Sequence, residues 1–159
     1  MEKPVVRGAW LLAVACAVSL AQSRTPQRVV FVCEHGAAKS LIAAAYFNKL
    51  AIDRGMDVRA TFRGVTPQDE LSVRAVEGLR ADGLGVPDQK PTEIRPDDID
   101  RATHVFAIGC ALPATLASSA KAGSWDDVPD DRGYPAMRDA IVVHVRALLD
   151  DIQSGKRAR

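Results

Sequence analysis

Three chemically active side chains fall close together in VVFVCEHGAAKSLIAA, residues 29–44. Cys33 carries a thiol, and Lys39 and Ser40 follow shortly after it. A cysteine thiolate is a nucleophile, a lysine ammonium attracts an anion, and a serine hydroxyl donates a hydrogen bond. Their spacing predicts a site where a thiolate meets a bound oxyanion. Alone, a cysteine at the end of a strand is better explained as a small buried residue, and the loop that follows it favours the nucleophile instead.

The residues between the thiol and the ammonium are small, so the backbone amides of this stretch are accessible to an anion. An apolar run over 28–32, typical of a strand buried in a parallel sheet, precedes the loop. A helix predicted over 40–54 follows it and directs its amino-terminal dipole at the same point. A glycine in the loop allows the positive φ that anion-binding loops often need. The predicted oxyanion-binding residues are Glu34, His35, Gly36, Ala37, Ala38 and Lys39.

The rest of the chain alternates between strand and helix patterns. Further strands are predicted over 57–63 and 104–108, and a loop over 125–134. Further helices are predicted over 70–82, 96–102, 113–120 and 135–153. This alternation predicts an α/β fold, a single three-layer α/β/α domain with a central parallel sheet of about four strands. Ligands bind beyond the carboxyl ends of such strands, where the cysteine loop lies.

Two phosphate-loop patterns compete for this segment. A nucleotide-binding loop of the Walker type requires glycine where Cys33 and Ala38 stand, so we exclude it. The stretch CEHGAAKS, 33–40, instead resembles the Cys-x5-Arg-Ser loop of the low-molecular-weight protein tyrosine phosphatases and the related thioredoxin-coupled arsenate reductases, with Lys39 in place of the arginine. The resemblance extends to RGVTP at 63–67, GLGVP at 83–87, VFAIGC at 105–110 and WDDVPDD at 125–131. It implies a phosphotyrosine protein phosphatase I-like domain over 22–159.

The resemblance implies a role for each matching residue. Cys33 would be the nucleophile that forms a phospho-enzyme, with Ser40 donating to its thiolate. Lys39 and the loop amides would hold the transferring group, and Asp130 would protonate the leaving group. The implied substrate is a phosphate monoester, either protein phosphotyrosine or a small aryl phosphate, and arsenate is the implied alternative. The expected partners are therefore phosphate, arsenate or a phosphorylated substrate.

Departures from the family pattern leave alternatives open. Lysine is a point charge, whereas arginine grips two oxygens at once. A degenerate relative that binds oxyanions without turnover is therefore the competing hypothesis. An aspartate also stands where the family has a proline, so the general acid is left open among Asp126, Asp127, Asp130 and Asp131.

Cys110 is a candidate redox partner of Cys33, because the reductases of this family carry a second cysteine near this place. Their third cysteine is missing, since Ala117 stands seven residues on. A single Cys33–Cys110 disulfide and a plain buried cysteine both remain open.

The amino terminus predicts export. Lys3 and Arg7 precede an apolar run over 9–21, and Ser19 and Ala21 stand where a signal peptidase reads small residues. We expect a signal peptide over 1–21 and a secreted or periplasmic protein. The alternatives are a buried amino-terminal helix, a lipoprotein attached through Cys16 and an uncleaved anchor.

The amino-acid composition limits the classes of protein and of binding partner that this chain could represent. The 159 residues are 47% hydrophobic and 26% charged, which indicates a globular protein, and the net charge is +1. We therefore expect no nucleic-acid partner, no stable membrane association after signal cleavage, and a monomer. His35 has no companion ligands, so neither a metal nor a cofactor is expected.

Overall fold

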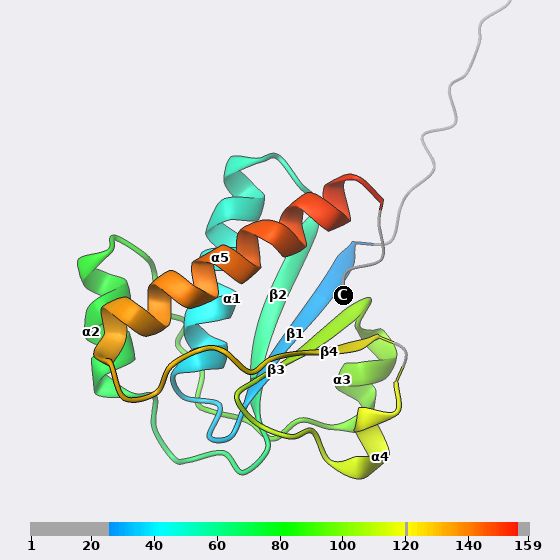
Figure 1. The fold of residues 1–159 in the computed structure, drawn as a ribbon, viewed down its shortest axis with the longest axis horizontal. Helices are drawn as coiled ribbons and strands as arrows, with labels where there is room; N and C mark the ends of the chain where they lie inside the picture. Colours follow the sequence, from blue (N-terminus) through cyan, green and yellow to red (C-terminus); the bar gives the residue numbers. More distant parts are fainter. Residues whose placement is uncertain (1–25, 120, 156–159) are drawn as a thin grey trace, which may run out of the picture.

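The computed structural model describes residues 26–119 and 121–155 (Figure 1). The predicted signal peptide over 1–21, and with it Cys16, lies outside the described residues and stays a prediction. Within them, no helix has both the length and the apolar character needed to span a bilayer.

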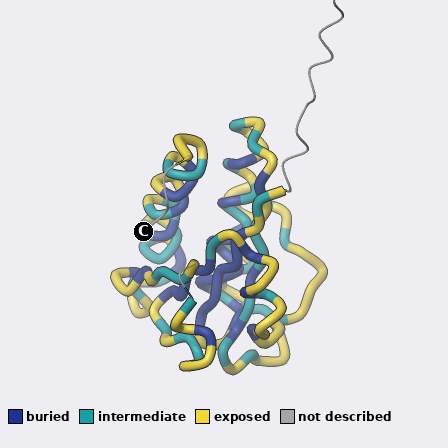
Figure 2. The backbone as a smooth tube through the Cα atoms, turned by 90° about the vertical axis from the view of Figure 1, so that its right-hand side faces the viewer, coloured by how far each residue is buried: buried dark blue, intermediate teal, exposed yellow. Residues whose placement is uncertain are grey.

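A four-stranded parallel sheet forms the centre of the fold. The strands are β1 (Gln27–Cys33), β2 (Val58–Gly64), β3 (His104–Ile108) and β4 (Ala122–Trp125), in the order β2-β1-β3-β4. β1 pairs in parallel with both β2 and β3, so it is covered on both sides by neighbouring strands. This confirms the predicted sheet, although the sequence had located only three of its strands. Figure 2 shows the strands as the most buried part of the backbone.

Helices cover both faces of this sheet (Figure 1). On one face α1 (Lys39–Asp53), α2 (Val73–Ala81) and α5 (Gly133–Gln153) pack on a large apolar cluster that contains Phe31, Phe47 and Phe106. On the other face α3 (Pro96–Arg101) and α4 (Ala114–Ala117) pack on a smaller cluster that contains Val30 and Val32. Alternate residues of β1 therefore enter opposite layers, as a strand buried on both faces requires. The predicted three-layer α/β/α architecture is confirmed.

The helix boundaries differ from the predicted ones by small amounts. α4 ends at Ala117, three residues short of the predicted end, and α5 begins two residues before Pro135. α1 ends at Asp53, one residue before the predicted end, and Gly55, with a φ of +63°, turns the chain away from the helix as predicted. Ser72 caps α2 by accepting a hydrogen bond from the amide of Ala75, so this helix begins later than its apolar pattern suggested.

Candidate active site

Hydrogen bonds to its carbonyl groups fix the loop between β1 and α1 against a neighbouring segment of the chain. Four of them accept hydrogen bonds from backbone amides of the segment that follows β2, which turns these oxygens away from the loop's interior. The accepting oxygens belong to Cys33, Glu34, His35 and Ala37, and the donors are the amides of Val65 (3.1 Å), Thr66 (2.8 Å), Gln68 (3.3 Å) and Ser72 (3.0 Å). The loop conformation is therefore fixed by its neighbour and does not depend on a ligand.

The amides of this loop are left without acceptors. Within the described residues, the N–H groups of residues 34–38 donate to no backbone or side-chain oxygen. They lie immediately before the first residue of α1, where the helix dipole adds partial positive charge. Free amides at a helix start are a site for an oxyanion. The geometry therefore agrees with the loop predicted from the sequence.

Gly36 is the residue that this loop conformation requires. Its φ is +62°, and a Cβ atom there would lie 2.8 Å from the backbone nitrogen of Gly64. The converse also holds, since a Cβ on Gly64 would lie 2.8 Å from the nitrogen of Gly36. Two glycines thus let the loop pack directly on the end of β2.

Cys33 and Ser40 face each other at the floor of the loop. The Cys33 Sγ atom lies 3.1 Å from the Ser40 Oγ atom, and both residues are buried. The contact joins the last residue of β1 to the first turn of α1. When the sulfur is ionised, the hydroxyl donates to it, which is the arrangement predicted from the sequence.

Lys39 forms an ion pair across the cleft with Asp130. Its Nζ atom lies 2.7 Å from Asp130 Oδ1, and the lysine side chain is 9% exposed whereas the aspartate is 73% exposed. Gly109, at the end of β3, leaves the space that the ammonium occupies, because a Cβ there would overlap the Nζ atom. The exposed partner of this pair is therefore the carboxylate.

The other three aspartates of the loop point elsewhere. Asp126 accepts a hydrogen bond from Ser124 at 2.9 Å, and Asp127 lies 2.7 Å from the Nε2 atom of His144. The hydrogen bond with His144 lowers the pKa of Asp127. Asp131 has no hydrogen bond or ion pair to another described residue. Of the four candidates left open, only Asp130 joins the cysteine loop.

Two contacts fix the ends of the segment that carries Asp130. At its start, the Trp125 ring stacks on the ring of His144 with centroids 4.8 Å apart. At its end, the Tyr134 hydroxyl donates to Asp82 Oδ2 at 2.6 Å, and its ring lies where a Cβ of Gly78 would otherwise be. None of these long-range contacts has a signal in the sequence.

A cleft of about 400 Å³ is lined by most of the predicted site residues. Cys33, Lys39 and Asp130 line it with most of the loop, and Ser40 lies buried behind them. Glu34 and His35 are exposed, and His35 Nδ1 lies 3.2 Å from the Thr66 carbonyl oxygen. Sequence reasoning missed four lining residues, which have no chemical signature in the sequence: Gln68, Ser72, Gly109 and Met137.

Cys110 lies near the site but in the other layer. Its Sγ atom is 3.7 Å from the carbonyl oxygen of Val32, and its side chain packs on the smaller apolar cluster. Cys33 instead faces α1 through Ser40. Both thiols are free. Burial, and to a lesser degree the neighbouring Cys33, raises the pKa of Cys110 to about 11.

Comparisons with known proteins agree with this geometry. A family model described as low molecular weight phosphotyrosine protein phosphatase matches residues 28–122. A Halobacterium salinarum protein with a provisional arsenate reductase name is 24% identical over 126 residues, which cover 77% of this chain and 83% of that protein.

Solved structures share the fold. YfkJ from Bacillus subtilis matches with a TM-score of 0.73 at 20% identity, over 84% of this chain and 99% of that one. A thioredoxin-dependent arsenate reductase from Corynebacterium glutamicum matches with a TM-score of 0.70 at 24% identity, over 84% of this chain and 65% of that one. A low molecular weight protein tyrosine phosphatase from T. tengcongensis matches with a TM-score of 0.66 at 25% identity, over 81% of this chain and 99% of that one.

The family model spans more than half of the chain and includes the cysteine loop, β2 and β3. Family members are phosphatases or arsenate reductases. The chain therefore belongs to the low molecular weight phosphotyrosine protein phosphatase family.

Proposed function

We propose that this protein is a cysteine-dependent phosphatase that hydrolyses a phosphate monoester, either protein phosphotyrosine or a small aryl phosphate. One observation carries the proposal: a buried thiol, a set of free amides, a buried ammonium and a carboxylate converge on one cleft. Each group matches a requirement of phosphoryl transfer, which depends on positioning and on charge stabilisation.

Phosphoryl transfer begins at the sulfur. The Cys33 thiolate attacks phosphorus, the bond to the leaving oxygen breaks, and the Asp130 carboxyl group gives its proton to that oxygen. The amides of residues 34–38 and the Lys39 ammonium hold the three equatorial oxygens. Water then attacks the phospho-cysteine and loses a proton to Asp130. Phosphate leaves, and the Cys33 thiolate regains its hydrogen bond from Ser40.

Lys39 changes partner when the substrate enters. In the free protein its ammonium pairs with Asp130 at 2.7 Å. A phosphoryl group carries more negative charge than one carboxylate and also reaches the loop amides, so it displaces Asp130 from the ammonium. The exposed carboxylate, released from the ammonium, takes up a proton from water and turns toward the leaving group as the acid.

Hydrolysis of p-nitrophenyl phosphate under reducing conditions tests the proposal. The wild type should release nitrophenol, and Cys33→Ser should reduce turnover to background. Lys39→Arg should increase turnover, because a guanidinium grips two oxygens, whereas the exposed Lys49→Arg should change nothing. Phosphate binding without turnover in both the wild type and Lys39→Arg would establish the degenerate, oxyanion-binding alternative instead.

The role of Asp130 is tested separately. Asp130→Asn removes both the proton donor and the competitor for Lys39, so turnover should fall roughly 100-fold while phosphate binds more tightly. Asp131→Asn is the matched control, since that neighbouring carboxylate has no partner among the described residues. Equal effects of the two substitutions on turnover would exclude Asp130 as the acid.

Arsenate reduction is the second candidate, and the nearby thiol of Cys110 favours it. In that reaction the Cys110 thiolate attacks the Cys33 sulfur of an arseno-cysteine. The S–S bond forms, the S–As bond breaks and its electron pair stays on arsenic, so that arsenic(V) is reduced to arsenic(III) and leaves as arsenite. The raised pKa of Cys110 and its place in the other layer oppose this step. Arsenite release that is lost in Cys110→Ala would identify the reductase.

Export is a further part of the proposal, supported by the charged and apolar pattern of residues 1–21. Amino-terminal sequencing of protein from the culture medium or periplasm should begin at Gln22. A mature chain that begins at Met1 in the cytoplasm would refute it.

A further inference from the structure

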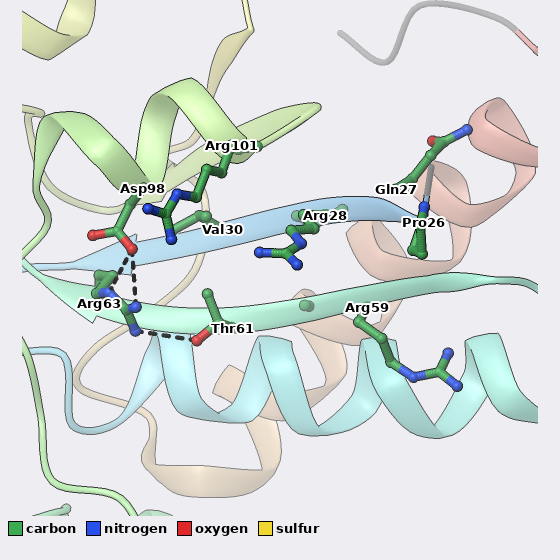
Figure 3. Close-up of a pocket in the computed structure, with 12 residues that line it drawn as sticks. Pro26, Gln27, Arg28, Val30, Arg59, Thr61, Arg63, Asp98 and Arg101 are labelled. Atoms are coloured by element: carbon green, nitrogen blue, oxygen red, sulfur yellow. Dashed lines mark hydrogen bonds and ion pairs between the residues drawn. The ribbon is translucent and has the colours of Figure 1, made fainter. Parts of the chain in front are cut away.

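A second cavity, of about 430 Å³, lies on the α3 side of the sheet, beside β1 and β2 (Figure 3). It is lined by the first half of β1, by β2 and by α3. Arg28 stands five residues before Cys33 on β1, which separates the two positions by about 16 Å along the strand. The two cavities have no lining residue in common.

The strand register gathers arginines on one face of the sheet. Arg28 pairs with Arg59, Val30 with Thr61, and Val32 with Arg63. Alternate residues of a strand share a face, and Val30 and Val32 pack in the layer of α3. The side chains of these β2 residues therefore lie on the α3 side, whereas α1 covers the opposite side of β2.

Four arginines and one carboxylate line this cavity: Arg28, Arg59, Arg63, Arg101 and Asp98. Their formal charges sum to +3, or to +2 without Arg59, whose guanidinium turns away, although the whole chain carries only +1. Like charges directly opposite each other on a sheet are destabilising. The concentration of arginines therefore has an electrostatic cost that an anion would remove.

The carboxylate is already fully engaged. Asp98 Oδ1 lies 2.9 Å from Arg63 Nη2, and Oδ2 accepts from the amide of Arg95 at 3.0 Å. Arg59 turns away from the cavity and donates to the carbonyl of Val58 at 2.7 Å (Figure 3). Asp98 therefore neutralises the charge of Arg63 and of no other arginine that lines the cavity.

Two arginines remain available to a ligand. Arg28 forms no ion pair with any described residue, and Arg101 contacts only Asp97, at 3.5 Å between two largely exposed side chains. In Figure 3 their side chains extend from β1 and from α3 toward the space beside Val30. Arg63 borders the same space, anchored by Asp98 and by the hydroxyl of Thr61 at 3.1 Å.

We propose that this arginine cavity is a second anion site, which binds a small multivalent oxyanion of the pyrophosphate type. A guanidinium group pairs with two oxygens of one phosphate, and two such groups on different elements match a ligand with two phosphates. The site is independent of the proposed phosphatase reaction, because it shares no residue with the cleft of Cys33.

Titration of the full chain with inorganic pyrophosphate tests the proposal. Lys39→Gln is used as the background, because it weakens binding at the cysteine loop. This variant should still bind one pyrophosphate, and amide shifts in NMR spectra should centre on residues 27–30 and 98–102. Adding Arg28→Gln and Arg101→Gln should weaken that binding at least about tenfold, the effect of losing one charged hydrogen bond.

A matched control distinguishes binding at the cavity from nonspecific attraction of pyrophosphate by positive charge on the surface. Arg74→Gln and Arg146→Gln remove two exposed arginines from α2 and α5, and pyrophosphate affinity should not change. An equal loss in this control, or no loss with Arg28→Gln and Arg101→Gln, would overturn the proposal. Arg28→Gln alone serves if the double substitution unfolds the chain. Binding of an acidic peptide in place of pyrophosphate would also overturn it, in favour of a protein partner.

The catalytic readout keeps the two proposals apart. Hydrolysis of p-nitrophenyl phosphate should be the same in the wild type and in the chain with Arg28→Gln and Arg101→Gln. Parallel loss of hydrolysis and pyrophosphate binding would mean that the cavity belongs to the active site, which contradicts the second site. Absence of hydrolysis in the wild type leaves the pyrophosphate result unaffected.

Discussion

The close approach of Gly36 to Gly64 makes it possible to measure how far the oxyanion loop depends on glycine at these two positions. Gly36→Ala has two costs: an alanine at a φ of +62°, and a Cβ atom 2.8 Å from the nitrogen of Gly64. The Gly64 backbone cannot move away easily, because its amide donates to the Thr92 carbonyl and its carbonyl accepts from the Ile94 amide, both at 2.9 Å. The substitution should therefore destabilise the fold and displace the loop.

Two other glycines separate these costs. Gly55 has nearly the same φ, +63°, but no atom within 4 Å of its Cβ position. Gly55→Ala should cost only the left-handed conformation, about 1–2 kcal/mol. Gly64→Ala should cost only the steric overlap, about 1–3 kcal/mol. The sum for Gly36→Ala is roughly 2–5 kcal/mol.

Urea unfolding followed by Trp125 fluorescence measures these free energies, and turnover of an aryl phosphate measures the displacement of the loop. Gly36→Ala and Gly64→Ala should lose both stability and turnover, whereas Gly55→Ala should lose stability alone. If Gly36→Ala cost no more than Gly55→Ala, the close approach would not constrain the loop, and the reasoning would be wrong.

Three further predictions concern the surroundings of the loop. Gly109→Ala places a Cβ where Lys39 Nζ lies, so kcat/KM should fall roughly 10- to 100-fold. Hydrogen bonds, first that from Tyr134, lower the pKa of Asp82. A lowered pKa in the folded state gives stability that is present above the unfolded value of 3.8 and is lost as pH falls through the folded value. Asp82→Asn should therefore cost about 2 kcal/mol at pH 7 and little in acid. Cys110, with its pKa raised to about 11, should react with iodoacetamide more slowly than a free thiol at pH 8, and faster as the pH approaches 11.

Each of these predictions has an internal control. Gly83→Ala has a comparable φ of +75° and open space around its Cβ, so it should leave kcat/KM unchanged. The exposed Asp88→Asn should show the same stability difference from the wild type at both pH values. Unfolding in denaturant should return Cys110 to the alkylation rate of a free thiol. Ordinary reactivity in the folded chain would contradict the burial argument.

The cysteine loop was predictable because its parts are consecutive in the chain. A β-branched run, a small-residue loop and a helix start follow one another between residues 28 and 54, so local propensities determine their geometry. The structure places the loop where the parallel sheet requires it, and the helix begins one residue before the predicted start. Cys33, Lys39 and Ser40 converge for the same reason.

The residue pattern alone did not show which aspartate lies at the cleft, because distant elements decide it, and only the family resemblance pointed to Asp130. Four aspartates stand within six residues, and their patterns are equivalent. His144 on α5 attracts Asp127, and Lys39 on α1 attracts Asp130. The contact of Gly36 with Gly64 likewise depends on how the β1 loop meets the end of β2, a relation between segments that no local pattern encodes.

β4 was missed for a packing reason. Its sequence, AGSW, is short and contains neither valine nor isoleucine. A Cβ on Gly123 would lie 2.7 Å from the Phe106 ring, so this position needs glycine. Because Phe106 of the neighbouring strand occupies the space of a side chain at Gly123, this strand lacks the β-branched residues by which strands are recognised in a sequence.

The pairing of Lys39 with Asp130 explains how a buried lysine is accommodated in this loop. A cation at the start of a helix is disfavoured by the dipole, and a buried ammonium requires a negative partner. Asp130 is that partner in the free protein. Because the pair has one buried and one exposed member, the carboxylate can leave without uncovering the ammonium. We therefore expect a dianion that also satisfies the free amides to replace Asp130, whereas a simple carboxylate offers no advantage over it. We expect the loop to select phosphate-like dianions by this exchange.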